Sequence, residues 1–464
     1  MQVRVADLVR GVRENQPGSP GFTSCARCLA EAAFESEPHL AATATKALFS
    51  ELVEDWADRF EPALCATYAA FMSEVLCAPG SPAAAPLAVL GYAAPEKLLE
   101  RYRRISSEGT GLGCDRKLVR KVAVLSRVTL GADVAVTRPV MLAAASAFPA
   151  AEIEFIGPRK NADLIVTGES VRHRAISYGR TALLADRLRA WTQLRDAVQG
   201  SVAGLRPDQY LIVDPDSRLT QLGLLPVSPD SSYQFFESRS EGNEGGSCLG
   251  TLATQWCSRT WGVDLAHTGC VSMQIPPAAH QCLSDENGRP LAAVSFGVGG
   301  RASKRVGDRF ENGLLELLRQ RGFRIVLDYG LGEDEARVVD RHIAAFAGTV
   351  GQLSRNQHGW PSHADLMTWR GSLADFGAWT GAADIYVGYD SAAAHIAAAY
   401  ATPVIEIFAG APSERFRHRW TPAGTAAVQV LPATGSAEAP ALLQHADHLL
   451  ASSTPVNARA RSHE

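Results

Sequence analysis

An aspartate and a serine directly follow a hydrophobic stretch in the second half of the chain. Residues 384–410 read DIYVGYDSAAAHIAAAYATPVIEIFAG, so Asp390 and Ser391 stand where a predicted strand ends and a predicted helix begins. Helix N-termini bind phosphate well because they present free N–H groups and partial positive charge. The small side chains from Ala392 onward would let a diphosphate approach the backbone, and His395 follows one turn later. The alternative is that Asp390 only caps the helix and His395 is an ordinary core histidine.

A glycine-containing segment upstream carries two basic residues. Residues 294–305 read VSFGVGGRASKR, which places Gly297 and Gly299 shortly before Lys304 and Arg305. Fixed cations near a departing diphosphate stabilise the negative charge that develops on it. The segment therefore favours a diphosphate contact, with a solvated basic pair at the start of a helix as the alternative.

A second glycine turn follows the predicted strand 323–329. It reads DYGLGEDE, and Gly330 and Glu333 are candidates for a contact with the nucleotide. A third glycine is missing at the spacing of the dinucleotide-binding fingerprint, so a dehydrogenase is disfavoured.

The first half of the chain offers one candidate base. A predicted buried strand, 121–127, is followed by Asp133 at the start of a predicted helix, 133–147. A carboxylate at a strand end can accept the proton of an attacking hydroxyl. The alternative is an acid that only stabilises the helix N-terminus. A further pair, Asp214 and Asp216, could hold a divalent metal, but Pro215 between them favours a turn.

The elements that must position these residues change in type along the chain. Apolar residues repeat at helical spacing from about 26 to 105, and strands alternate with helices from 121 onward. Such alternation is typical of parallel sheets covered by helices. The polar stretch 215–246 is expected to be a loop or interdomain segment. We therefore predict an α/β protein with two doubly wound domains preceded by an α-helical region.

Three of these segments together resemble glycosyltransferase family 9, the heptosyltransferase family. The order Asp390, Ser391, His395 and the following alanines, then Pro403 and a strand ending in F-A-G, is similar to the family's donor motif. Residues 130–139, LGADVAVTRP, resemble its L-G-D-V-x-x-T-x-P segment, except that Ala132 stands where the family usually has glycine. The glycine loop with its basic residues is the third match. The resemblance spans about 121–422.

The resemblance implies a GT-B fold, with two Rossmann-like domains facing a cleft. We expect an α-helical N-terminal domain at 1–115, an acceptor-side Rossmann-like domain at 116–285, a donor-binding Rossmann-like domain at 286–435, and a C-terminal helix and tail at 436–464.

The resemblance also implies a reaction and roles for the candidate residues. The reaction is metal-independent transfer, with inversion, of a sugar from a nucleoside diphosphate sugar such as ADP-heptose to an acceptor hydroxyl. Asp133 would be the base, Lys304 and Arg305 would stabilise the leaving diphosphate, and Asp390 and Ser391 would hold the donor. No cofactor is implied. The acceptor, a glycan, a lipid-linked saccharide or a protein, and the oligomeric state stay open. A non-catalytic sugar-nucleotide-binding protein and a nucleotide-sugar epimerase are the alternatives.

Bulk composition agrees with a globular protein. The 464 residues carry a net charge of −4, which does not favour a nucleic-acid partner. No apolar run is long enough to span a bilayer, so we expect a cytoplasmic location. Nine cysteines favour reduced thiols over a disulfide framework. Cys25 and Cys28 lack a second pair at zinc-binding spacing, so we interpret them as core residues of a helix.

Overall fold

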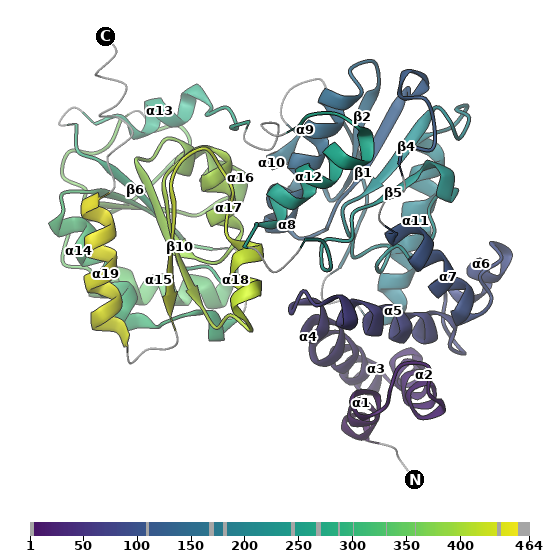
Figure 1. Ribbon diagram of the computed structural model, residues 1–464. Coiled ribbons are helices and arrows are strands. Elements are labelled where there is room, and N and C mark those ends of the chain that lie inside the picture. Colours follow the sequence, from purple (N-terminus) through teal and green to yellow (C-terminus); the bar gives the residue numbers. More distant parts are fainter. Residues whose placement is uncertain are drawn as a thin grey trace. The chain divides into compact units, whose positions relative to one another are not determined.

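The computed structural model divides the chain into two compact units, Met1–Thr268 and Gly269–Glu464 (Figure 1). The structure describes residues 4–107, 111–166, 171–179, 183–242, 246–265, 271–285, 288–299, 301–330, 332–357, 359–433 and 438–452.

The first unit begins with helices. They are α1 Val5–Glu14, α2 Pro20–Phe34, α3 Pro38–Lys46, a π-helical segment Ala47–Val53, α4 Glu54–Ala57, α5 Pro62–Cys77, α6 Ala84–Val89 and α7 Pro95–Ser106. Four of these helices start with proline, whose fixed φ suits a first helical turn. Cys25 is half-buried on α2 whereas Cys28 is exposed, so the interpretation of both as core residues is wrong for Cys28.

A parallel sheet follows in the same unit. Its strands are β1 Lys121–Leu125, β2 Glu152–Gly157, β3 Val171–Ala175, β4 Tyr210–Asp214 and β5 Tyr233–Phe235, in the order β3-β2-β1-β4-β5. The helices of this part are α8 Leu130–Ala132, a π-helical segment Asp133–Thr137, α9 Arg138–Ala147, α10 Arg159–Ile165, α11 Leu184–Ser201 and α12 Leu249–Trp261. The order changes direction between β1 and β4, which is where open α/β sheets bind ligands at the carboxyl ends of their strands.

The described residues of the polar stretch 215–246 are mostly turns, as expected for a loop, but the stretch lies within the first unit and is not an interdomain segment. It contains β5, and Leu219, Leu222 and Phe236 are buried in it. Buried apolar residues alternate there with serines and acids that hydrogen-bond inside the unit. The prediction of a loop is therefore correct for most of this stretch, and the interdomain alternative is wrong.

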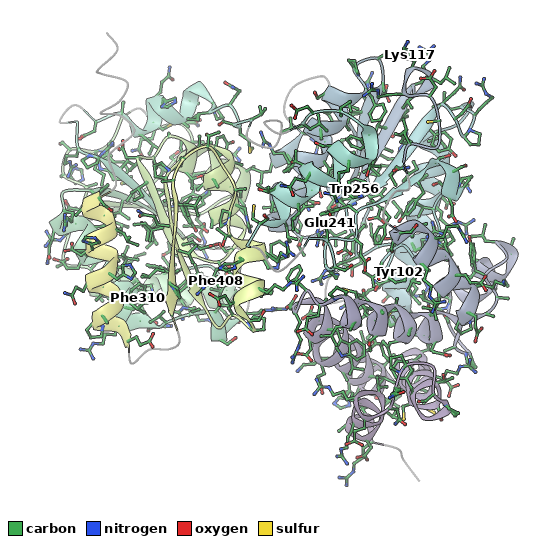
Figure 2. The ribbon with its side chains drawn as sticks, viewed as in Figure 1. Tyr102, Lys117, Glu241, Trp256, Phe310 and Phe408 are labelled. Atoms are coloured by element: carbon green, nitrogen blue, oxygen red, sulfur yellow. The ribbon has the colours of Figure 1, made fainter. Side chains whose placement is uncertain are left out.

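One hydrophobic cluster joins the N-terminal helices to the first sheet. It runs from Leu8 and Phe22 through α11 to residues of β1 and β4. Tyr102 of α7, labelled in Figure 2, donates a hydrogen bond to Glu237 after β5. The N-terminal helices thus share a core with the sheet.

The second unit is built on a seven-stranded parallel sheet in the order β12-β11-β10-β6-β7-β9-β8 within the described residues. The strands are β6 Leu291–Ser295, β7 Arg324–Asp328, β8 Val350–Gln352, β9 Leu366–Trp369, β10 Ile385–Tyr389, β11 Val404–Ala409 and β12 Val428–Ala433. The helices are α13 Pro277–Leu283, α14 Asp308–Gln320, α15 Glu333–Ala345, α16 Leu373–Gly381, α17 Ala392–Ala399, α18 Glu414–Trp420 and α19 Ala439–Ser452.

Helices cover both faces of this second sheet. Phe310 of α14 belongs to the cluster on one face, and Tyr386 of β10 belongs to the cluster on the other. Phe310 and Phe408 are labelled in Figure 2. The predicted mixed α/β class with two parallel-sheet domains is therefore confirmed. No helix in the described part of the chain has both the length and the apolar character needed to cross a bilayer.

Candidate active site

A cavity of about 230 Å³ lies at the carboxyl ends of β6 and β7. Phe296, Gly297, Arg305, Asp328 and Gly330 are among the residues that line it. Of the residues predicted to bind the donor, Gly297, Arg305 and Gly330 thus meet in one place. A cavity at the strand ends of a parallel sheet is the usual ligand position in this class of fold.

Glu335, in the first turn of α15, ties the two glycine turns of this cavity together. Its Oε1 accepts a hydrogen bond from the N–H of Gly299 at 3.1 Å. Gly330 has a φ of 75°, and a Cβ placed there would lie 2.5 Å from Oε2 of Glu335. Glycine is therefore required at 330 for both conformation and space.

Glu333, which the sequence suggested for this contact, lies elsewhere. Its side chain is 92% exposed and forms an ion pair with Arg337 at 3.4 Å. Helix geometry separates residues 333 and 335 by about 200°, so the two carboxylates point in different directions. Glu335 is the residue that sequence reasoning missed, and its signal was the second glutamate of the run GEDE.

Asp328 adds a second carboxyl group to the cavity. Its oxygens accept hydrogen bonds from the Ser295 hydroxyl and the Gly330 N–H, each at 3.1 Å. Burial raises the pKa of Asp328 to about 6. The cavity can therefore offer carboxyl oxygens to hydroxyl groups of a ligand.

Lys304 lies between this cavity and the start of α17. Its ammonium group forms an ion pair with the Asp390 carboxylate. Gly410 holds this arrangement, because it has a φ of 66° and a Cβ there would lie 2.7 Å from the carbonyl oxygen of Ser303. Lys304 also lies 5.8 Å from the centre of the Phe416 ring. The predicted partners of a diphosphate, Lys304 and Asp390, are thus paired with each other.

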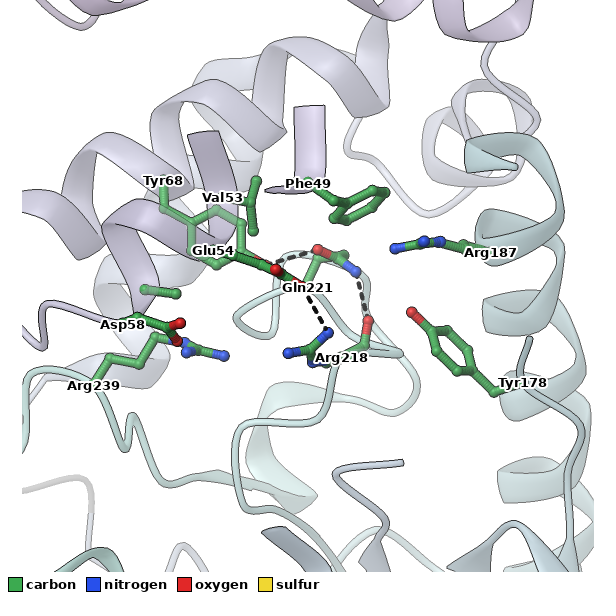
Figure 3. Close-up of a pocket in the computed structure, with 11 residues that line it drawn as sticks. Phe49, Val53, Glu54, Asp58, Tyr68, Tyr178, Arg187, Arg218, Gln221 and Arg239 are labelled. Carbon is green, nitrogen blue, oxygen red and sulfur yellow. Dashed lines mark hydrogen bonds and ion pairs between the residues drawn. The ribbon is translucent and has the colours of Figure 1, made fainter. Parts of the chain in front are cut away.

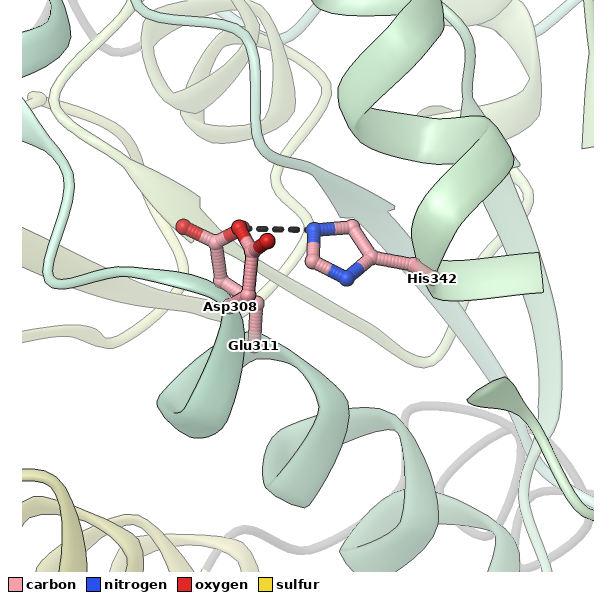
Figure 4. Close-up of side chains that lie close together, drawn as sticks. All are labelled: Asp308, Glu311 and His342. Carbon is pink, nitrogen blue, oxygen red and sulfur yellow. Dashed lines mark hydrogen bonds and ion pairs between the residues drawn. The ribbon is translucent and has the colours of Figure 1, made fainter. Parts of the chain in front are cut away.

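Arg305 is engaged within its own unit. Its guanidinium donates to Asp308 at 2.8 Å and to Oε1 of Glu311 at 3.0 Å. Glu311 also meets Nε2 of His342 at 2.6 Å, as Figure 4 shows. Asp308, Glu311 and His342 have metal-ligand atoms within 4.8 Å of one another. Because Arg305 pairs with both carboxylates and Arg341 pairs with Asp308 at 2.9 Å, the geometry is that of an ion-pair network.

The start of α17 contains several buried polar atoms. Ser391 is the N-cap residue, but its side chain makes no capping hydrogen bond, contrary to the expected capping role, and Ala392 begins the helix. The Ser391 hydroxyl, the Tyr386 hydroxyl and Nδ1 of His395 are buried without a hydrogen-bond partner among the described residues. Burial lowers the pKa of His395 to about 4, so the ring is neutral at pH 7. It packs edge-on against Trp420, with centroids 6.0 Å apart.

Glu406 is a second residue that sequence reasoning missed. It lies on β11 and is fully buried, and neither carboxyl oxygen has a partner among the described residues. Burial raises the pKa of Glu406 well above its ordinary value, the charge of Asp390 adds to the rise and Lys304 opposes it. A single acid inside the apolar strand VIEIFA was the available signal.

Asp133, the predicted base, is fully buried in the first unit. Its carboxylate accepts hydrogen bonds from Ser126, the N–H of Arg127, Thr137 and Asn161 at 2.5–2.7 Å. Burial raises its pKa while these donors oppose the rise. In this geometry Asp133 orders the loop after β1, and it would reach an acceptor only if that loop opened.

The pair Asp214 and Asp216 fits a turn better than a metal site. Asp216 has a φ of 68° and lies 3.1 Å from Arg239 and 3.7 Å from Arg127. Asp214 accepts hydrogen bonds from the Ser217 N–H and the Thr220 hydroxyl, each at 2.6 Å. The two carboxylates are therefore occupied by separate donors.

Comparison with known proteins finds a family match for part of the chain. Residues 272–442 match the model of glycosyltransferase family 9 (heptosyltransferase). The structure is similar to that of a family 9 glycosyl transferase from Veillonella parvula DSM 2008, with a TM-score of 0.51 and 13% identity over 69% of this chain and 88% of that one. This likeness supports the fold. The match of residues 272–442 shows that this part of the chain is a glycosyltransferase family 9 domain.

Two Escherichia coli structures are also similar. Heptosyltransferase WaaC with ADP has a TM-score of 0.46 and 16% identity, over 71% of this chain and 99% of that one. ADP-heptose lps heptosyltransferase II has a TM-score of 0.47 and 15% identity, over 70% of this chain and 99% of that one. No curated protein matches the sequence.

Proposed function

We propose that this glycosyltransferase uses a nucleoside diphosphate sugar that binds at the carboxyl edge of the second sheet. One observation carries the proposal. The cavity that Glu335 and the two glycine turns form lies beside the paired Lys304 and Asp390 at the start of α17. A nucleoside in the cavity and a diphosphate at the start of α17 would thereby be neighbours within one unit.

The nucleoside would occupy the cavity of about 230 Å³. Ribose hydroxyls can donate hydrogen bonds to the carboxyl groups of Glu335 and Asp328, since each carboxylate oxygen can accept more than one. Phe296 and Tyr329 provide flat apolar surface in the same lining. Heptose is the sugar that the family description suggests, and adenine is the base that the sequence resemblance to the family implies.

The diphosphate would replace Asp390 as the partner of Lys304. The first N–H groups of α17 and the cation of Lys304 would then stabilise the charge that builds up as the nucleoside diphosphate leaves. Arg305 lines the cavity, but its guanidinium is already paired with Asp308 and Glu311, so the main cation offered to the diphosphate is Lys304. Because these groups can neutralise the leaving group, transfer is proposed to need no metal.

Transfer would proceed with inversion, by direct attack of an acceptor hydroxyl on the anomeric carbon. Asp133 stays the proposed base, and its burial requires the loop after β1 to open when the acceptor binds. Asp133→Asn should reduce turnover by at least about 100-fold while leaving donor affinity unchanged. Unfolding of the variant must be measured in parallel, since an amide at 133 would face four donors. Normal turnover in a folded Asp133→Asn protein would remove Asp133 as the base.

The closed position of Asp133 favours a second candidate, a protein that binds sugar nucleotides without transferring the sugar. The possibilities are separated by incubating the protein with ADP-, GDP- and UDP-sugars. Each sugar nucleotide is tested with and without a mixture of glycan, lipid-linked saccharide and peptide acceptors, and with and without EDTA. Acceptor-dependent, EDTA-resistant release of nucleoside diphosphate and an inverted linkage in the product would support transfer. Conversion of the donor without acceptor would indicate an epimerase, and binding without conversion would favour the second candidate.

A further inference from the structure

The paired Lys304 and Asp390 are each one residue away from a buried network in the second unit. Arg305 directly follows Lys304, and Tyr389 directly precedes Asp390. Arg305 and Tyr389 both hydrogen-bond to one carboxylate, that of Glu311 in the first turn of α14. The same anchor therefore holds the chain next to both members of the ion pair.

Glu311 is the centre of this network. It is fully buried, and Oε1 accepts hydrogen bonds from Nε of Arg305 at 3.0 Å and from the Tyr389 hydroxyl at 2.7 Å. Its other oxygen lies 2.6 Å from Nε2 of His342 (Figure 4). Burial alone would raise the pKa of Glu311, but these hydrogen bonds lower it below its ordinary value, so the carboxylate is charged. A buried charge is stable only with such partners, which fixes their positions.

Tyr389 connects the network to the segment that carries Lys304. Its hydroxyl donates a hydrogen bond to Glu311 and accepts one from the N–H of Val306 at 2.8 Å. Burial raises the pKa of Tyr389 above its ordinary value and the charge of Glu311 adds to the rise, so the hydroxyl keeps the proton that it donates. One hydroxyl thus joins the backbone two residues after Lys304 to the strand that ends just before Asp390.

A lysine at a phosphate site benefits from such support because its side chain is long and flexible. Ordering a flexible side chain costs conformational entropy, so a group that is already in place binds its ligand more tightly. The Lys304 side chain is largely buried, and its ammonium has to exchange the Asp390 carboxylate for a diphosphate. A backbone held next to both residues restricts Lys304 to that exchange.

We propose that Glu311 and Tyr389 are positioning residues for the diphosphate. They fix the backbone at 304–306 against the end of β10 and thereby place the ammonium of Lys304, without touching the ligand themselves. Arg305 takes part by pairing with Glu311. The inference rests on the proposed function, because it concerns the same site.

Titration calorimetry on the full chain tests the proposal with ADP, GDP and UDP and with the corresponding nucleosides. The ratio of the nucleoside Kd to the nucleoside diphosphate Kd reports what the phosphates contribute to binding. Tyr389→Phe keeps the buried ring, and Glu311→Gln keeps the shape of the side chain. Each should lower this ratio at least about fivefold by weakening the diphosphate and leaving the nucleoside unchanged.

Tyr68→Phe is the matched control. Tyr68 is a buried tyrosine of the first unit, and its hydroxyl donates a hydrogen bond to Gln221 at 2.8 Å (Figure 3). Loss of one buried hydroxyl at this position should leave the ratio unchanged.

A double-mutant cycle separates positioning from a general loss of stability. Because Tyr389 acts through Lys304, Tyr389→Phe should weaken the diphosphate at least about fivefold in wild type but less than about twofold in Lys304→Gln. Glu311→Gln combined with Lys304→Gln gives a second, independent cycle. Melting temperatures without ligand show which variants are folded.

An unchanged ratio in a folded Tyr389→Phe or Glu311→Gln protein, an equal loss in Tyr68→Phe, or losses that add to that of Lys304→Gln would overturn the proposal. The last result, with Lys304-dependent binding intact in wild type, would leave the proposed function standing. Failure of all three diphosphates to bind wild type would instead refute the proposed function, together with the positioning roles that rest on it.

Discussion

Replacing the buried Glu406 by glutamine should stabilise the protein increasingly as the pH rises. In the folded protein, burial raises the pKa of Glu406 well above its ordinary value of 4.5, so the carboxyl keeps its proton. In the unfolded chain it ionises near that ordinary value. A group whose folded pKa is raised contributes stability that is lost as the pH rises toward the folded pKa.

The size of the effect follows from the linkage between protons and folding. Each pH unit between the two pKa values costs about 1.4 kcal/mol, so wild type should lose up to about 2.7 kcal/mol relative to Glu406→Gln between pH 5.5 and 7.5. Glutamine has nearly the same shape as a protonated glutamic acid and cannot ionise, so it isolates this contribution.

Urea unfolding of wild type and Glu406→Gln at pH 5.5, 6.5 and 7.5 measures the difference. Glu31→Gln, on the exposed side of α2, is the control and should change the free energy of unfolding by less than about 0.5 kcal/mol at each pH. Parallel pH curves for wild type and Glu406→Gln would mean that Glu406 is ionised in the folded protein, and the account of the buried carboxyl would be refuted.

Three further predictions concern the second unit. Glu335→Ala should weaken nucleoside diphosphate binding by about 10- to 100-fold in titration calorimetry. Glu333→Ala should leave the affinity unchanged because that side chain is exposed. Equal losses of affinity in the two variants would contradict the placement of the nucleoside in this cavity. Gly330→Ala should lower the free energy of unfolding by about 1–3 kcal/mol. Gly332→Ala should not, because there is open space for a Cβ at that position. An unchanged free energy of unfolding in Gly330→Ala would exclude the expected clash with Glu335. Burial lowers the pKa of His395 to about 4, so wild type should lose up to about 3 kcal/mol of unfolding free energy relative to His395→Gln as the pH falls from 6.5 to 4. Urea unfolding at those pH values measures this loss. No pH-dependent difference between the two proteins would mean that His395 is protonated in the folded protein.

The sequence predicted the strands at the centres of both sheets because they are continuous apolar runs. Lys121–Leu125 lies within the strand expected at 121–127, and Ile385–Tyr389 is the strand expected directly before Asp390. The shorter edge strand Val350–Gln352 was missed, since three partly exposed residues leave little pattern. Strand β5 was missed because its segment is polar, and the polar groups are satisfied by side chains far away in sequence, as Asp216 is by Arg127.

The sequence predicted which segments form the candidate site, but it did not predict which of their side chains face the cavity. Lys304, Asp390 and the glycine turns were found because their spacing follows the strands. Which acid faces the cavity, Glu333 or Glu335, depends on where α15 begins, and sequence patterns place helix ends only to within a few residues. The burial of Asp133 and Glu406 depends on tertiary packing, which a local pattern does not contain.

The most direct test of the central claim is binding of nucleoside diphosphates to the second unit's site in the full chain. Thermal unfolding is followed with ADP, GDP and UDP, for wild type and for Lys304→Gln, which retains a polar side chain beside Asp390. A ligand present at 100 times its Kd stabilises the folded state by about 2.7 kcal/mol. We predict that one of the three nucleotides raises the melting temperature of wild type. Lys304→Gln should be folded without nucleotide but should lose most of this shift. No shift with any nucleotide, or an equal shift in the variant, would contradict the claim.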